Sequence, residues 1–254
     1  MKVKIGVLVI GSLLWDETVK RQAWRSQLCL ADKISVPLPI RYGRESSSRE
    51  NTYSMVFSNN INHTGAYGMG YAIPYTTPVI NKQDFFKRMI DLAKAEGISD
   101  SRICKSWGTV CLIINPFIEK ERADEIKKYW EELVANTKGQ LNRGQLEPNI
   151  TMFGEHDEIK SITEDWYLNL NLTTEFQNEL KDFDCLVATS NAVKLRKNIN
   201  IYPTAKQIAK AIYANSYFTY FMNNRKNKIQ TFEDKYIARI LKRKFKICLK
   251  DYRE

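Results

Sequence analysis

The apolar positions in the first half of the chain fall into short runs that predict β-strands. Lys2 to Ile10 is a dense Val, Ile and Leu run that ends at Gly11, which is typical of a buried strand followed by a loop. Residues 34–42 contain two prolines and predict an edge or irregular strand. Runs rich in β-forming residues predict further strands at residues 52–57, 66–75 and 108–115.

Helical periodicity lies between and after these strands. Residues 81–95 carry apolar side chains at helical spacing, and Gly97 stands where a helix is expected to end. Residues 119–136 predict a charge-rich amphipathic helix. Residues 173–181 predict a short helix, which precedes a short strand at residues 185–189.

The C-terminal region carries two helix start signals. Thr204 and Gln207 have the spacing of a capping box, as do Thr231 and Asp234, and apolar residues at helical spacing follow each pair. We therefore expect two helices near the C-terminus. Residues 138–164 show no clear period and predict irregular structure.

The net positive charge of the chain comes from its C-terminal quarter. The 254 residues have a formal net charge of +10. Residues 191–254 hold 16 lysines and arginines against 4 aspartates and glutamates, a net +12, whereas residues 1–190 hold 23 against 25, a net −2. A basic tail suits contact with nucleic acid, an anionic membrane surface or an acidic partner. Aromatic residues interleave with the basic ones, as in nucleic-acid binding, but packing of these aromatics onto the rest of the protein is the interpretation we favour.

The remaining composition is that of a globular intracellular protein. Apolar residues make up 43% of the chain and charged residues 27%, and no apolar stretch approaches the roughly 20 residues of a membrane-spanning helix. Trp15 and Asp16, rather than small residues, follow the first apolar run, which favours a buried strand over a signal peptide. The five cysteines are scattered without a C-x-x-C pair, so we expect no zinc cluster and a reducing, cytoplasmic location.

The first strand ends in a candidate binding loop. Gly11 leads into Ser12, Leu13 and Leu14, and consecutive backbone N–H groups in such a loop can converge on one anion while glycine permits close approach. The two glycines of this region do not form the G-x-G-x-x-G pattern of a dinucleotide site.

The segment Val9–Trp15, V-I-G-S-L-L-W, resembles the glycine–serine loop of the γ-glutamylcyclotransferase-like family. The order of the elements that follow is similar as well, and the helix ending Lys94–Gly97, K-A-E-G, looks like the family's L-D-x-x-E-G ending. The resemblance covers about residues 1–116. Two positions depart from the family pattern, since Ile10 stands in place of a tyrosine and Ala93 in place of an aspartate.

The resemblance implies a reaction and a set of site residues. The family releases 5-oxoproline from γ-glutamyl amides, with the backbone of the loop holding the substrate's α-carboxylate. Matched motif to motif, the loop is Gly11, Ser12 and Leu13, followed by Leu14, and the general acid/base is Glu96. That role requires Glu96 to be at least partly removed from water. No metal or organic cofactor is implied.

Three arginines form a further candidate site. Arg41, Arg44 and Arg49 cluster around the serines of residues 46–48, between two predicted strands. Guanidinium groups bind carboxylates and phosphates in a bidentate manner, so these side chains, Arg41 among them, are candidates for the distal end of the substrate. The alternative is a solvated loop.

These observations together predict an α/β (α+β) fold. Residues 1–116 are expected to form a mixed, bent or barrel-like sheet of γ-glutamylcyclotransferase-like type, and residues 117–254 a mostly helical extension with basic C-terminal helices. The expected function is a cytoplasmic enzyme that releases 5-oxoproline from a small γ-glutamyl substrate. The alternative is a non-catalytic binding protein of the same fold, whose basic C-terminal helices contact nucleic acid or an acidic partner.

Overall fold

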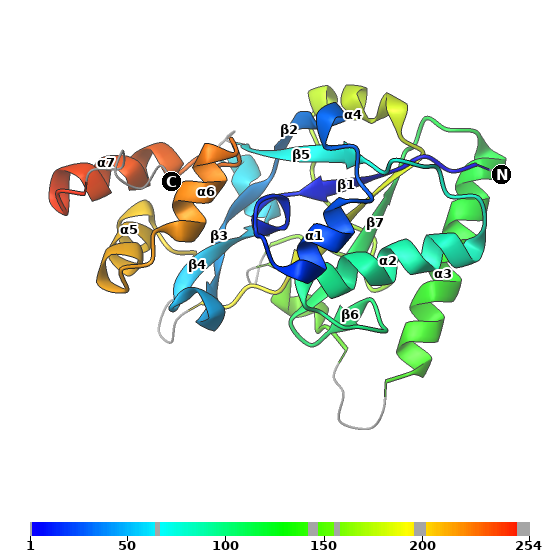
Figure 1. Ribbon diagram of the computed structural model, residues 1–254, viewed down its shortest axis with the longest axis horizontal. Coiled ribbons are helices and arrows are strands. Elements are labelled where there is room, and N and C mark those ends of the chain that lie inside the picture. The colour runs from blue at the N-terminus through cyan, green and yellow to red at the C-terminus, as the bar shows by residue number, and fades with distance from the viewer. Residues whose placement is uncertain (1, 64–66, 142–146, 155–157, 196–201, 248–254) are drawn as a thin grey trace.

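The computed structural model describes residues 2–63, 67–141, 147–154, 158–195 and 202–247 (Figure 1). In these residues the chain is mixed α/β, with a six-stranded sheet of order β2-β5-β1-β8-β7-β6 and a separate hairpin of β3 and β4. The strands are β1 (Ile5–Val9), β2 (Ile34–Leu38), β3 (Ile40–Ser46), β4 (Thr52–Phe57), β5 (Gly68–Pro74), β6 (Cys104–Lys105), β7 (Gly108–Ile114) and β8 (Cys185–Asn191).

The centre of the sheet is the parallel pair β1 and β8. All five residues of β1 are buried, as its unbroken run of apolar residues predicts for a strand covered on both faces. Every other named pair of neighbouring strands is antiparallel. Because β1 and β8 run in the same direction, their C-terminal ends open at the same edge of the sheet, where the loop that follows β1 begins.

The sheet crosses the boundary expected at residue 116. Strand β8 belongs to the C-terminal half of the chain, yet it lies between β1 and β7. Residues 1–116 therefore do not complete the sheet by themselves. Within the described residues the sheet also stays open, with β2 and β6 at its edges, so it is not a closed barrel.

The strand expected at residues 34–42 is divided in two. Pro39 separates β2, which pairs with β5 at the edge of the sheet, from β3, which pairs with β4. Proline lacks the N–H that a continuous ladder would need, which accounts for the edge position predicted from the two prolines. The chain thereby leaves the main sheet and carries residues 40–57 across to the hairpin.

Helices cover the sheet and extend one end of the molecule. In the described chain these are α1 (Val19–Arg25), α2 (Lys82–Glu96), α3 (Lys120–Gly139), α4 (Thr174–Glu179), α5 (Ala205–Ala214), α6 (Thr219–Lys226) and α7 (Asp234–Lys244). Helix α2 packs against β7 and β8, and α3 packs against α2 and β7. Helices α5 to α7 gather at the end of the molecule opposite the N-terminus, beside the β3–β4 hairpin (Figure 1).

Among the described residues 202–247, the chain forms three helices where two were expected. The capping box of Thr204 and Gln207 is present and begins α5. Ser216, with a φ of 51°, then interrupts the apolar periodicity, so Thr219–Lys226 forms the separate helix α6. At the third helix Asp234 accepts hydrogen bonds from the N–H and hydroxyl of Thr231, but α7 begins only at Asp234 itself.

Helix α2 begins and ends as its sequence predicts. The Asn81 side chain accepts a hydrogen bond from the Asp84 N–H at the start, and Gly97 adopts a left-handed conformation, with a φ of 82°, at the end. Phe85, Met89 and Leu92 face the core. This ending makes Glu96 the last residue of the helix.

The four cysteines in the described residues are not joined in disulfides. Cys104, Cys111 and Cys185 are buried and Cys29 is partly exposed, all four as thiols, and Cys248 lies outside the described residues.

In the part of the chain that the structure describes, no helix is long and apolar enough to span a membrane.

Candidate functional site

The loop after β1 is a single turn of 3₁₀ helix. It comprises Ser12–Leu14, and the side chains of Ser12 and Leu13 are buried. Leu14 N–H donates to Gly11 O (3.2 Å), which closes the turn. The backbone N–H groups of Ser12 and Leu13 belong to the first turn and have no acceptor among the described residues. The loop thus leaves two consecutive backbone donors without an acceptor at the end of a buried strand.

Glu96 lies beside this loop and is largely removed from solvent. Its side chain is 12% exposed. Asn191 Nδ2 donates to Glu96 Oε1 (3.2 Å), and Arg21 Nη2 lies 3.8 Å from Glu96 Oε2. Arg21 is itself held by Asp16 (2.6 Å) and by Ala95 O (3.1 Å). The carboxylate is therefore held by groups from two separate segments, α1 and β8.

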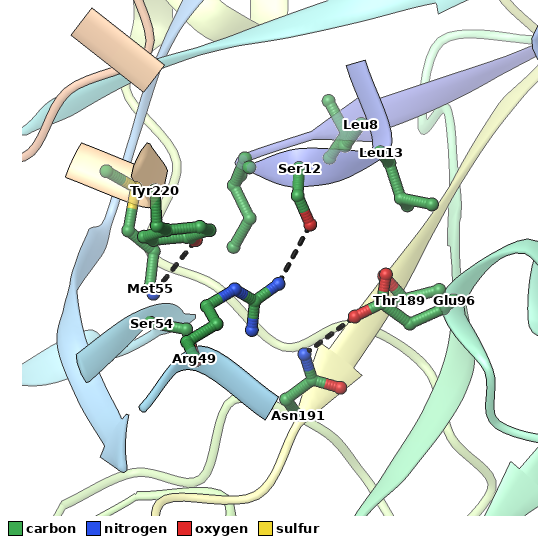
Figure 2. A pocket seen from close by; sticks show the side chains of 12 residues that line it. Leu8, Ser12, Leu13, Arg49, Ser54, Met55, Glu96, Thr189, Asn191 and Tyr220 are labelled. Atoms are coloured by element: carbon green, nitrogen blue, oxygen red, sulfur yellow. Dashed lines mark hydrogen bonds between the residues drawn. The ribbon is translucent and has the colours of Figure 1, made fainter. Parts of the chain in front are cut away.

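One small cavity joins the loop and the carboxylate (Figure 2). Gly11, Ser12, Leu13 and Glu96, which the sequence assigned to a common site, all line it. We call it the site cavity; its other walls are Leu8, Ile10, Arg49, Ser54, Met55, Thr189, Asn191 and Tyr220. Its volume is about 30 Å³, which leaves space for a few water molecules at most.

Arg49 lies across this cavity between the loop and Glu96 (Figure 2). Arg49 Nη2 donates to Ser12 Oγ (2.9 Å), and Arg49 Nη1 donates to Ser46 Oγ (3.3 Å). Its guanidinium carbon is 4.4 Å from the ring centroid of Tyr220, within the range of a cation–π contact. Arg49 thus brings a positive charge directly to the candidate binding loop.

Tyr220 reaches the site from helix α6 in the C-terminal extension. Its hydroxyl accepts a hydrogen bond from Met55 N–H (3.2 Å), and burial raises the pKa of this phenol. A Cβ atom on Gly11 would lie 2.7 Å from the same hydroxyl, so a side chain at residue 11 would require Tyr220 to shift. Asn224, one turn further along α6, accepts a hydrogen bond from Trp15 Nε1 (2.7 Å). Helix α6 therefore closes one wall of the site.

Sequence reasoning did not find Asn191, Thr189 or Tyr220. A signal for the first two exists, because polar residues at the end of a strand parallel to β1 meet the same edge of the sheet. Using it requires knowing that β8 pairs with β1, although 180 residues separate Ile5 from Cys185. Tyr220 has no local signal, since its position depends on how α6 docks.

Two residues assigned to the site from the sequence lie elsewhere. Leu14 is packed against the hydrophobic core and does not line the site cavity. Arg41 is also absent from its walls, and its guanidinium lies over the rings of Tyr202 (4.0 Å) and Phe232 (5.7 Å). Tyr202 packs against Gly43 as well, so this aromatic ring occupies the space beside β3 into which the Arg41 side chain extends.

The aromatic residues of the C-terminal helices are used in packing. Phe218, Tyr220 and Phe221 are buried, and Tyr213 is stacked on Phe245 at a centroid distance of 4.3 Å. Of these rings, Tyr220 packs against the first half of the chain, whereas Tyr213 stacks within the C-terminal region and is 46% exposed. Basic residues remain along α7, at Lys235, Arg239, Lys242, Arg243 and Lys244.

The site consists of hydrogen-bonding and acid–base groups. Among the described residues, no three His, Cys, Asp or Glu side chains are grouped so as to hold a metal ion. No protein-family model, no curated protein and no solved structure matches this chain. The function must therefore be inferred from the arrangement of the side chains themselves.

Proposed function

We propose that this protein is a γ-glutamylcyclotransferase-like enzyme, which releases 5-oxoproline from a γ-glutamyl amide by intramolecular aminolysis. One observation carries the proposal: Glu96, the candidate acid/base at the end of α2, lines the same cavity as the Gly11–Ser12–Leu13 loop. The two motifs are more than 80 residues apart in the sequence.

In the proposed reaction the neutral α-amino nitrogen of the substrate attacks its own γ-carbonyl carbon. Glu96 accepts the proton from that nitrogen as the five-membered lactam closes. The same proton then passes to the nitrogen of the leaving amine as its bond to the γ-carbon breaks. The N–H groups of Ser12 and Leu13, which have no acceptor among the described residues, are suited to the α-carboxylate. Because nucleophile and carbonyl belong to one molecule, holding the folded substrate supplies much of the rate.

The small volume of the site cavity has a consequence for binding. A γ-glutamyl group is several times larger than a water molecule, so it fits only if the Arg49 side chain leaves Ser12. Arg49 is half-buried and makes no ion pair among the described residues, and it is held by its hydrogen bonds to the two serines and its contact with the Tyr220 ring.

The test is 5-oxoproline release from a panel of γ-glutamyl amides by the wild type and Glu96→Gln. The variant keeps the size of the side chain and removes its ability to accept a proton. We expect the wild type to release 5-oxoproline and the variant to be slower by a factor of about 100 or more. Glu121→Gln, at an exposed position on α3, makes the same chemical change away from the site and should leave the rate unchanged.

Two outcomes would contradict the proposal in different ways. Equal rates for the wild type and Glu96→Gln would keep the reaction but remove Glu96 from its mechanism. No release from any amide in the panel, with circular dichroism showing a folded protein, would contradict the reaction itself.

A further inference from the structure

A second hollow opens directly beside the site cavity. It has a volume of about 350 Å³, and we call it the outer hollow. Arg49, Ser54, Glu96 and Asn191 line both spaces. The outer hollow therefore has room for a group attached to a carbonyl held at Glu96, and its remaining walls decide which groups fit there.

Two arginines on these walls carry charges that the protein does not neutralise. Arg44 Nη1 donates to Ala192 O (2.8 Å), and its guanidinium lies 5.2 Å from the ring centroid of Trp107. Arg49 donates to serine hydroxyls. In the part of the chain that the structure describes, neither guanidinium forms an ion pair. Arg21, on the same wall, differs because it is paired with both Asp16 and Glu96.

The balance of charge around the outer hollow is positive. Burial lowers the pKa of Arg44, and the nearby positive charge of Arg49 also lowers it. The negative charge of Glu96 acts in the opposite direction. Lys194 contributes a further positive charge from an exposed position. Two carboxylates, Glu45 and Glu96, also line the hollow, and Glu96 already faces Arg21. Charges removed from water are unfavourable unless they are paired, so an anion that pairs with Arg44 and Arg49 would be stabilised in this hollow.

We propose that the outer hollow is an anion subsite, in which Arg44 and Arg49 bind a carboxylate or phosphate group carried by the leaving amine of the substrate. That the anion belongs to a leaving amine rests on the proposed function, whereas the binding of an anion does not. Guanidinium groups match the paired oxygens of carboxylates and phosphates, and the hydroxyls of Ser46, Ser47 and Ser48 on the same wall are additional donors.

The subsite is tested first by binding, without turnover. Isothermal titration calorimetry of the full chain would use inorganic phosphate and N-acetylglycine as anionic probes, and N-acetylglycinamide as the neutral counterpart of the latter. We expect at least one anion to bind, the neutral amide to show no saturable binding, and Arg44→Gln to weaken anion binding by about tenfold to a hundredfold. Arg44→Lys, which keeps the charge, should lose less.

The controls separate the subsite from general electrostatics and from misfolding. Arg239→Gln removes the same charge from the exposed face of α7 and should leave binding unchanged. If Arg44→Gln does not fold, Lys194→Gln, at an exposed position on the rim, replaces it and should weaken binding by a smaller factor. Equal binding by the wild type and the folded variants, or no anion binding more tightly than N-acetylglycinamide, would overturn the proposal.

Turnover then identifies the kind of anion. The substrates are matched pairs: γ-glutamylglycine against γ-glutamylglycinamide, and γ-glutamyl-O-phosphoethanolamine against γ-glutamylethanolamine. We expect one charged member to be preferred by about tenfold to a hundredfold in kcat/KM, mainly through KM, and Arg44→Gln to abolish the preference. Equal rates within both pairs would overturn the subsite while the proposed reaction stands. Anion binding without any turnover would overturn the reaction while the subsite stands.

Discussion

Gly11 has an extended backbone, with a φ of −175°, that any residue can adopt, so its importance lies in the space beside it. A Cβ atom there would be 2.7 Å from the Tyr220 hydroxyl. That hydroxyl is buried and holds the N–H of Met55. The absence of a side chain at residue 11 therefore permits a phenol from α6 to reach a strand of the hairpin.

We predict that Gly11→Ala destabilises the protein by about 1–3 kcal/mol, because the methyl group displaces Tyr220 and deprives the Met55 N–H of its partner. Tyr220→Phe removes the atom that the methyl group meets. The double variant should therefore lose less stability than the sum of the two single variants, by about 1 kcal/mol in urea unfolding. Strictly additive losses would show that the contact between residues 11 and 220 is not the cause.

The site residues differ in how far the sequence could identify them. Glu96 and the Gly11–Ser12–Leu13 loop belong to continuous motifs, in which a strand or helix ends at a glycine. Asn191 and Tyr220 become recognisable only when distant segments meet at the loop. Arg41 and Arg49 could not be ranked from composition, since both lie near the same serines. In the structure Arg49 lines the site cavity, whereas the guanidinium of Arg41 packs on the ring of Tyr202.

At the scale of elements, helix α7 begins with two buried carboxylates. Glu233 is 7% exposed and Asp234 is fully buried. Burial raises the pKa of Glu233 to about 7, against the effect of Arg41, and the neighbouring Asp234 adds to the rise. Burial likewise raises the pKa of Asp234 to about 6, although hydrogen bonds from Thr231 lower it. Docking of this helix therefore removes two acidic groups from water.

The raised pKa of Glu233 makes stability depend on pH. The folded state holds the proton up to about pH 7, whereas the unfolded state releases it near 4.5, so this contribution to stability is complete below pH 4.5 and is lost as the pH rises through 7. We predict that Glu233→Gln is more stable than the wild type at pH 8 by roughly 2–3 kcal/mol and gains little at pH 4. Urea unfolding at both pH values measures this difference. A gain of equal size at the two pH values would exclude titration of Glu233 as its cause.

At the scale of the whole molecule, the sheet ties the two halves of the chain together. Strand β8 pairs with β1 over Ile5–Leu8 and with β7 along the full length of both strands. Asn191, at the end of β8, also holds Glu96. A fragment that stops at residue 116 would lack the strand between β1 and β7 and would leave one edge of each unpaired.

We predict that residues 1–116 expressed alone do not fold cooperatively, because they cannot cover the central apolar strand β1. Thermal unfolding followed by circular dichroism should give a single steep transition for the full chain and a broad, non-cooperative change for the fragment. A steep transition for the fragment would show that the first half is an independent unit, in spite of the sheet order.

The sequence by itself determined most of the elements and two motifs of the site. Local patterns suffice for these, since the strand before Gly11, the helix that ends at Gly97 and the capping box at Thr204 depend on neighbouring residues alone. The tertiary structure decided the insertion of β8 between β1 and β7, the closure of the site by Tyr220, and the choice of Arg44 and Arg49 over Arg41. These depend on which buried surfaces and unpaired charges meet across the fold, and contacts between distant segments leave no period in the sequence.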